Sequence, residues 1–180
     1  MKKISLALLA LLGSVILFSS CHKDDNRIYY QVGDQTFVND ASSSNSFEIQ
    51  AGHLAMARGV SDSVKAFADS MINDNTKIAA NLSAVASPNG FTIPATLQVV
   101  DQNNLNALNT LTGVAFDKEY ATIMVSAHGG VLTLFNSAAA PNGVGTPALR
   151  VFASGQIPGL QTQLALSRRL VQVVSSESGQ

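Results

Sequence analysis

The chain has 180 residues, of which 46% are hydrophobic and 13% are charged. Eleven Lys and Arg stand against twelve Asp and Glu, and the basic residues are scattered rather than gathered in a stripe. Because nucleic-acid binding needs a basic surface, this near-equal number of acidic and basic residues predicts that nucleic acid is not a partner. The length is enough for one domain with an adequate core.

The chain opens on an apolar leader. Two lysines precede an apolar run, residues 4–18, and two serines stand before Cys21. The run is shorter than the roughly 20 residues that a membrane-spanning helix needs, which disfavours the alternatives of a retained membrane anchor or a buried helix. A basic start, an apolar middle and small residues at the end are typical of a secretory signal peptide. We therefore expect residues 1–20 to be a signal peptide.

Cys21 is the only cysteine of the chain. A lone cysteine in an exported protein cannot form an internal disulfide, so it is either a free thiol or chemically modified. Lipidation explains its place directly after the leader. More than one acyl chain, palmitate among them, would give stable attachment at about 0.8 kcal/mol for each buried CH₂ group. We expect the membrane to be a partner through a lipid on Cys21, and no second apolar stretch is long enough to act as an anchor.

A charged segment follows the cysteine and leads into residues 21–34, which we interpret as a lipidated tether. The order Lys23, Asp24, Asp25 after Cys21 resembles the surface-export signal of lipoproteins in the Bacteroidota. The resemblance implies display on the cell surface, and the alternative interpretation is a solvated linker. Because His22 and not aspartate follows the cysteine, we expect an outer-membrane lipoprotein, facing the periplasm if it is not displayed outside.

From residue 35 to residue 175 the pattern is helical. Gly59 stands where a first helix would end, and Ser61 can cap the next. Breaks at residues 87–90 and 141–143 divide the rest, and Thr146 before Pro147 is a suitable N-cap. Apolar residues recur at three and four positions along the later helices, as one buried face requires. These residues are Val64, Phe67, Ala68, Met71, Ile78, Ala79, Leu82 and Val85; Phe116, Tyr120, Ile123, Met124, Ala127, Val131 and Phe135; and Leu149, Phe152, Ala153, Leu160, Leu164, Ser167 and Val171.

Alternation with a period of two is too short anywhere to predict a sheet, so we expect an all-α fold. Four long amphipathic segments, with a longer link from residue 87 to residue 101, predict an up-down four-helix bundle with one crossover. Residues 105–111 should add a helical piece before Gly113 interrupts it. We expect the serines 42–44 and 46 on the polar surface of the first helix, and residues 176–180 as a polar tail.

A resemblance to a known family rests on residues spread over most of the domain. It is carried by Phe47 and Glu48 with Leu54 and Ala55; Val64, Lys65, Phe67, Ala68, Met71 and Asp74; Phe116, Asp117, Tyr120 and His128; and Pro158 and Leu164. This order resembles a bacterial family of unknown function whose members are described as outer-membrane or periplasmic proteins. The resemblance implies a ferritin-like bundle and names no activity.

Members of that family commonly carry a histidine after the aspartate of the second helix and another in the last helix. Here Asn75 and Gln163 occupy those places, while Glu48 and His128 remain. All four fall on or beside the apolar stripes, so we predict a polar layer inside the bundle. Amide side chains suit hydrogen bonds better than transition-metal ligation, so we predict no metal there.

A di-iron site of the ferritin type is excluded by its ligand requirement. Such a site needs a glutamate from each of two helices and Glu-x-x-His from each of the other two. The chain has three glutamates and no Glu-x-x-His. A zinc or copper site would have to draw on Glu48, His128, His53 and Asp74. His53 follows Glu48 by five residues, about 140° around a helix, so the two side chains should diverge.

Two functional classes remain open at this point. The first is a non-enzymatic, membrane-tethered helical domain of the envelope or cell surface, with no cofactor and with a protein partner that the residues do not identify. The second is a domain that binds a small ligand, a metal or a redox group in a polar pocket of the bundle. They differ in whether His128 and its neighbours are sealed by packing or open to a cavity.

Overall fold

The computed structural model describes residues 32–177, and the regular secondary structure within this range consists of helices only, as the sequence predicts. None of the described helices combines the length and the apolar character that crossing a membrane requires. The elements are α1 (Asp34–Arg58), α2 (Asp62–Ala86), the 3₁₀ turn η1 (Ser87–Asn89), α3 (Val99–Asn109), α4 (Gly113–Ala139) and α5 (Pro147–Glu177).

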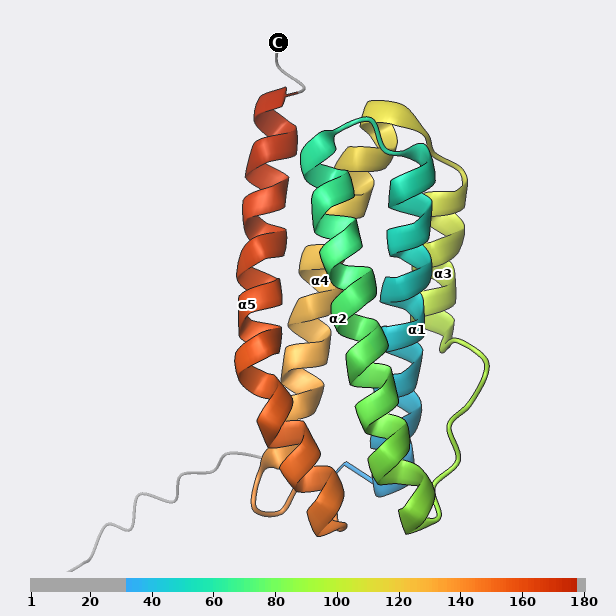
Figure 1. The fold of residues 1–180 in the computed structure, drawn as a ribbon, viewed down its shortest axis with the longest axis vertical. Helices are drawn as coiled ribbons and strands as arrows, with labels where there is room; N and C mark the ends of the chain where they lie inside the picture. Colours follow the sequence, from blue (N-terminus) through green and yellow to red (C-terminus); the bar gives the residue numbers. More distant parts are fainter. Residues whose placement is uncertain (1–31, 178–180) are drawn as a thin grey trace, which may run out of the picture.

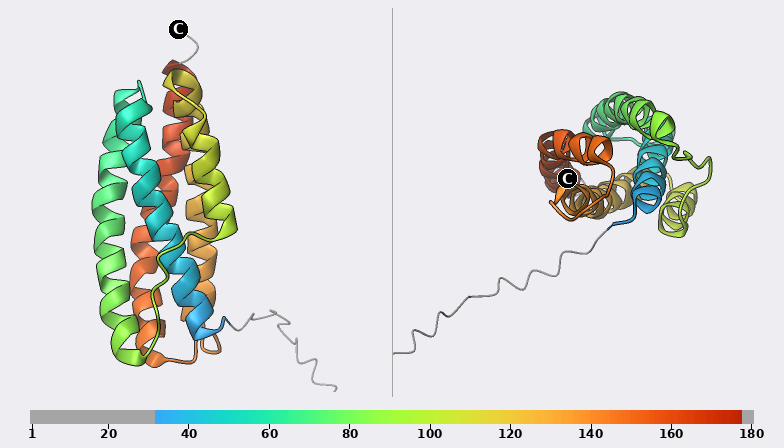
Figure 2. Two further views of the ribbon diagram at one scale, coloured as in Figure 1. Left: turned by 90° about the vertical axis from the view of Figure 1, so that its right-hand side faces the viewer. Right: turned by 90° about the horizontal axis from the view of Figure 1, so that it is seen from below.

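The long helices form two antiparallel hairpins that pack against each other (Figure 1). One hairpin is α1 with α2 and the other is α4 with α5, while α2 also contacts α5 and α1 contacts α4. Seen from below, α1 and α5 lie at opposite corners, and α3 lies outside, beside α1 and α4 (Figure 2). We call the end where α1 and α5 begin the base, and the opposite end the far end.

Local signals start α2 and bring it close to α1. The Ser61 hydroxyl accepts a hydrogen bond from the Val64 N–H at 3.3 Å, which confirms the predicted cap. Gly52 of α1 faces Ile72, and a Cβ at Gly52 would lie 2.7 Å from the Ile72 side chain. The missing side chain therefore sets how closely the two helices of this hairpin pack.

Each hairpin turn is held by a carboxylate from the other hairpin. At the far end, Asp117 of α4 accepts hydrogen bonds from the backbone N–H groups of Val60, at 3.2 Å, and Ser61, at 2.8 Å. At the base, Asp34 of α1 accepts from the N–H of Gly145 at 2.5 Å and from that of Thr146 at 3.0 Å. These contacts satisfy backbone donors that the turns leave free, and they fix the hairpins relative to each other.

The structure corrects the expected role of Thr146. It precedes the first residue of α5, and its carbonyl accepts the first helical hydrogen bond from Arg150, as an N-cap residue should. Its hydroxyl, however, donates to Asp34 at 2.6 Å. The nearby carboxylate of α1 is a stronger acceptor than any group in the turn, so the hydroxyl acts as a donor between helices.

The link from α2 to α4 runs along α1 and differs from the sequence prediction. Its helix begins at Val99 and not at residue 105, because Leu105 and Leu108 pack inward and Asp101 lies in the first turn, where its charge favours the helix N-terminus. The amide of Gln35 pairs with the backbone of Thr92, donating to its carbonyl at 2.8 Å and accepting from its N–H at 3.1 Å.

The prediction that the serines of α1 form a polar surface is wrong for Ser42 and Ser43, which are buried. The Ser43 hydroxyl donates to Asp101 and accepts from the backbone N–H of Gln98 at 2.7 Å. The start of α3 covers this part of α1, which turns a polar surface into an interface. The sequence pattern did not predict the burial of Ser42 and Ser43. The link has no apolar repeat that would indicate which helix it packs against.

Candidate functional site

The predicted polar residues of three helices meet at Glu48. Its side chain, on α1, is only 2% exposed. The Oε2 atom accepts a hydrogen bond of 2.7 Å from the Asn75 amide of α2, and the Nε2 atom of His128 of α4 lies 3.4 Å from the same oxygen. The second distance is long and poorly aligned for a hydrogen bond, so the contact with His128 is electrostatic. We call Glu48, Asn75 and His128 the polar layer.

His128 is fully buried and oriented by its own helix. Its Nδ1 lies 2.7 Å from the carbonyl oxygen of Met124, and since a carbonyl only accepts, Nδ1 carries the proton. A neutral ring would then present the lone pair of Nε2 to the Glu48 carboxylate. Burial lowers the pKa of His128, but attraction to Glu48, together with the contacts to Glu48 and Met124, raises it above its ordinary value.

Asn75 supplies donors to the polar layer. Its amide nitrogen donates to Glu48 and also to the carbonyl oxygen of Met71 at 3.0 Å, and the residue is 1% exposed. The N–H₂ group therefore faces the carboxylate, and a donor group in this place cannot ligate a cation there. The described residues also contain no group of three His, Cys, Asp or Glu side chains placed to hold one ion. With Asn75 oriented in this way, the polar layer presents no complete set of metal ligands, and we derive no chemistry through a metal.

Gln163 departs from the predicted layer. It is 5% exposed on α5, but in the described part of the chain its Oε1 has no hydrogen-bond partner. It borders a hollow of about 400 Å³ between α2 and α5, next to Asp74 and Lys77. The reason is geometric: α5 lies diagonally across from α1, so the side chains of α2 and α4 are the ones that reach Glu48 (Figure 2).

The other candidate ligands do not approach the polar layer. His53 is exposed, on the face of α1 away from Glu48, as the predicted divergence requires. Asp74 pairs with Lys77 at 3.6 Å on the surface of α2. Cys21, Lys23, Asp24 and Asp25 lie outside the described residues.

Tyr120 is a polar neighbour that sequence reasoning placed among the apolar residues. It is fully buried, its ring stacks on Phe116 at 5.9 Å between centroids, and its hydroxyl has no partner in the described structure. Burial, and then the charge of Glu48, raise the pKa of Tyr120 far above its ordinary value, which keeps the phenol protonated. The sequence feature that could have predicted this buried hydroxyl is a tyrosine on an otherwise apolar helical face.

A second acidic region, also missed from sequence, lies where α3 begins. Asp40 and Asp101 border a hollow of about 340 Å³ between α1, α3 and α4. Burial raises the pKa of both carboxyls; for Asp101 the hydrogen bond from Ser43 opposes this, and the charges of Glu48 and Asp40 add to it. Among the described residues, no Lys or Arg borders this hollow. The residues that line it come from α1, α4 and the start of α3, and the sequence did not predict that these segments lie next to one another.

The polar layer divides the hydrophobic core in two. Along the four long helices, one apolar cluster lies on the base side of Glu48, Asn75, His128 or Gln163 and another on the far side, except that Phe47, which directly precedes Glu48, belongs to the far cluster. The base cluster includes Phe37, Val38, Ile78, Leu82, Val131, Phe135, Leu149, Phe152 and Leu160. The far cluster includes Phe47, Val64, Phe67, Met71, Leu108, Phe116, Tyr120, Met124, Leu170 and Val174.

Comparison with known proteins identifies a family and no activity. The family model described as Domain of unknown function (DUF4142) matches residues 25–170, which include the whole polar layer. No curated protein and no solved structure matches the chain. Because the family model matches most of the 180 residues, the chain belongs to the DUF4142 family of domains of unknown function.

Proposed function

We propose that this protein is an exported lipoprotein whose helical domain acts in the cell envelope without catalysing a reaction. The proposal that the domain does not catalyse a reaction rests on the burial of the polar layer. Glu48, Asn75 and His128 are 2%, 1% and 0% exposed and are oriented by one another. A catalytic site must admit its substrate, whereas these side chains are sealed by packing.

The polar layer has a structural use. A buried carboxylate that has a partner in only one arrangement of the helices destabilises every other arrangement, because there it would stay buried without a partner. Glu48 finds its partners on α2 and α4, so the layer fixes these two helices relative to α1. Two hairpins joined by one long link along α1 also support a ferritin-like four-helix bundle as the architecture.

The membrane half of the proposal rests on the sequence. The apolar leader and the lone Cys21 after it support lipidation. His22 after the cysteine supports the outer membrane. The order Lys23, Asp24, Asp25 supports display on the cell surface in a host from the Bacteroidota.

The Cys21→Ala variant tests the anchor. We expect the parent protein to partition into the detergent phase with the membrane fraction, and the variant to be released or to retain its leader. Ser20→Ala, next to the processing site, serves as the control because it keeps a small residue there. A Cys21→Ala protein that partitions like the parent contradicts the anchor.

Protease added to intact cells tests surface display. We expect the parent to be digested and a variant with Lys23, Asp24 and Asp25 replaced by Ala to be protected, while both are digested in lysed cells. Equal protection of the two forms in intact cells would show that the charged triplet is only a linker.

A specific observation favours a second function, binding of a small ligand, a metal or a redox group in the core. Six buried side-chain polar atoms lack partners in the described structure, and four of them belong to the polar layer or to buried residues near it: Glu48 Oε1, Tyr120 OH, His128 Nε2 and Gln163 Oε1. Buried polar groups without partners are rare in native proteins. Metal analysis after dialysis, with melting curves before and after a chelator, separates the two functions. We expect no stoichiometric metal and an unchanged melting temperature, and a bound metal whose removal lowers that temperature would establish the second function.

A further inference from the structure

Charge is distributed very unevenly along the bundle. Residues 78–100, 120–149 and 151–167 contain no Asp, Glu, Lys or Arg. Together they form the last part of α2, the first part of the link, most of α4 and the first half of α5. These segments meet at the base, so that end of the molecule is assembled from uncharged stretches far apart in sequence (Figure 1).

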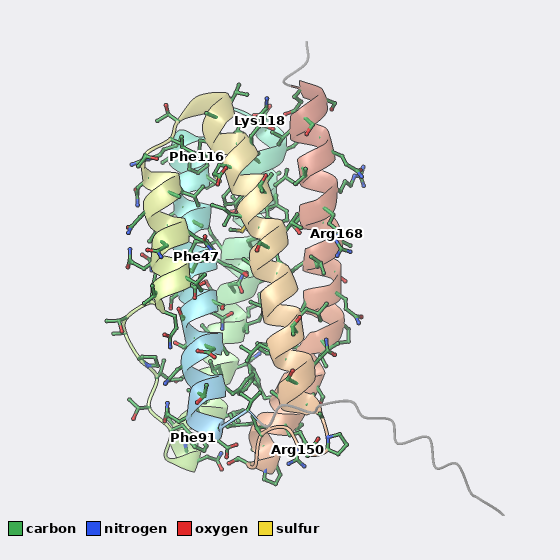
Figure 3. All side chains as sticks on the ribbon, turned by 180° about the vertical axis from the view of Figure 1, so that it is seen from behind. Phe47, Phe91, Phe116, Lys118, Arg150 and Arg168 are labelled. Atoms are coloured by element: carbon green, nitrogen blue, oxygen red, sulfur yellow. The ribbon has the colours of Figure 1, made fainter. Side chains whose placement is uncertain are left out.

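The two charged residues that lie at the base among the described residues are used internally. Asp34 accepts hydrogen bonds from the turn between α4 and α5. Arg150, labelled at the lower end of α5 in Figure 3, donates from Nη2 to the carbonyl oxygen of Val144 at 2.6 Å. Both side chains are half-buried, so neither is a freely solvated charge.

The base also exposes apolar groups. Val151 is 72% exposed, and Phe91 and Ile93 are half-buried at the same end (Figure 3). A hollow of about 560 Å³ lies beside Val151, between the end of α2 and the start of α5. Its apolar lining consists of Ala84, Val85, Pro147, Ala148, Val151 and Phe152.

The far end carries the charges that the base lacks, although Met56, Val60 and Val114 are also exposed there. Charged side chains cluster there on α1, α2, α4 and α5; Figure 3 shows Lys118 near this end and Arg168 farther down, in the distal half of α5. They include Arg58, Asp62, Lys65, Lys118, Glu119, Arg168, Arg169 and Glu177. Such a surface is strongly hydrated, and moving it to a low-dielectric boundary would cost the hydration of every charge.

The position of the proposed lipid anchor indicates which end of the bundle can reach the membrane. Cys21 stands eleven residues before Val32, where the described chain begins at the base. Eleven residues span about 40 Å at most when fully extended, less than the roughly 46 Å length of a 31-residue helix such as α5. A lipid on Cys21 would therefore keep the base within reach of the bilayer and exclude an upright bundle that rests on its far end.

We propose that the base, defined by the turns 87–93 and 140–147 and by Val151, is a membrane-contact surface that rests on the lipid interface. The inference rests on the proposed lipid anchor at Cys21. Contact with headgroups removes no free charge from water, allows Val151 and the apolar hollow to be covered, and leaves the charged far end in solvent. The bundle then stands upright on the membrane.

The test uses the full mature lipoprotein, purified in detergent and reconstituted into phosphatidylcholine vesicles. Single cysteines carrying an environment-sensitive fluorophore are placed at exposed positions, Asn89→Cys at the base and Asn109→Cys at the far end. We expect nitroxide-labelled lipid to quench the base probe at least about twofold more than the far probe, and aqueous iodide to give the reverse order. Equal iodide quenching at both ends, or a base probe protected from both quenchers by a protein contact, overturns the inference.

A pair of charge variants provides the matched control. Ala148→Asp combined with Val151→Asp puts two charges on the base in the first turns of α5, where acidic residues suit the helix N-terminus and should not disturb folding. We expect the base probe to become accessible to iodide in this variant, while Gln172→Asp in the distal half of α5 leaves it protected. No difference between the two variants contradicts membrane contact.

The same preparation separates failure of the inference from failure of the anchor. The parent protein has no thiol besides Cys21, so a lipidated parent should not react with a maleimide. Reaction of the parent overturns the anchor and the inference together. An unreactive parent with a water-exposed base overturns the inference alone.

Discussion

The two apolar clusters of the core are built by different means. In the base cluster, the rings of Phe37, Phe135 and Phe152 contact one another, with centroids 5.2 to 6.3 Å apart. The far cluster instead borders Glu48 and His128, and Phe67 meets His128 edge to face at 6.1 Å. The base cluster is centred on contacts among three phenylalanine rings, whereas in the far cluster an aromatic ring contacts His128 of the polar layer. Apolar burial tolerates a shift of one helix along another, whereas a buried polar pair does not. We therefore expect the base cluster to contribute most of the free energy of unfolding and the polar layer to select one arrangement of the helices.

The largest loss should come from the base cluster. Phe135→Ala removes a buried ring that contacts two others, and we expect the free energy of unfolding to fall by about 4 kcal/mol. Phe91→Ala is the control because the same side chain is only half-buried there, and we expect less than half that loss. Denaturant unfolding measures both, and equal losses would mean that the aromatic cluster is not a special source of stability.

A smaller but informative loss should come from the polar layer. His128→Leu leaves Glu48 buried with only Asn75 as a partner, and we expect a loss of about 3 kcal/mol. The double variant Glu48→Leu with His128→Leu removes both charges, and its stability should return to within about 1 kcal/mol of the parent or exceed it. Additive losses in the double variant would contradict a mutually compensated pair.

The contact between α1 and the link should contribute less. Ser43→Ala removes a donor to Asp101 and an acceptor for the Gln98 N–H, so we expect a loss of about 1 to 2 kcal/mol. Ser44→Ala, one position along, should change stability by less than about 0.5 kcal/mol. If thermal unfolding shows the two variants to be alike, the link does not depend on this anchor.

The smallest effect should be a dependence on pH. Because the pKa of His128 is raised in the folded state, its protonation stabilises the fold fully below its unfolded pKa, about 6.5. That contribution is lost as the pH rises through the higher folded pKa, so the free energy of unfolding should fall as the pH rises above about 6.5. His53→Asn should keep this slope, because His53 is exposed, and His128→Asn should remove it. A slope that survives in His128→Asn would assign it to another group.

Much of the helical architecture could be predicted from the sequence. The apolar repeat from Val64 to Leu82 identified the buried face of α2, and Ser61 identified its start, because periodicity and capping are local properties of the chain. The residues of the polar layer were proposed from the family resemblance together with their position on apolar stripes, and both can be recognised without a structure.

Contacts between distant segments could not be predicted in this way. Asp34, Asp117 and Ser43 carry no local signal for the turns and the link that they hold. Gln163 occupies the expected kind of position but sits across the diagonal from Glu48, and Tyr120 reads as an apolar residue until its hydroxyl is seen beside a buried carboxylate. Each case depends on which helices are neighbours.

The sequence by itself determined the helices, their buried faces and the uncharged stretches, because hydrophobic periodicity and composition are written along the chain. Only the tertiary structure decided that three uncharged stretches gather at one end, and that Glu48 is satisfied by α2 and α4. It also decided that α3 covers the serines of α1. The physical reason is that packing and electrostatics act through space, between residues whose separation in sequence gives no measure of their distance.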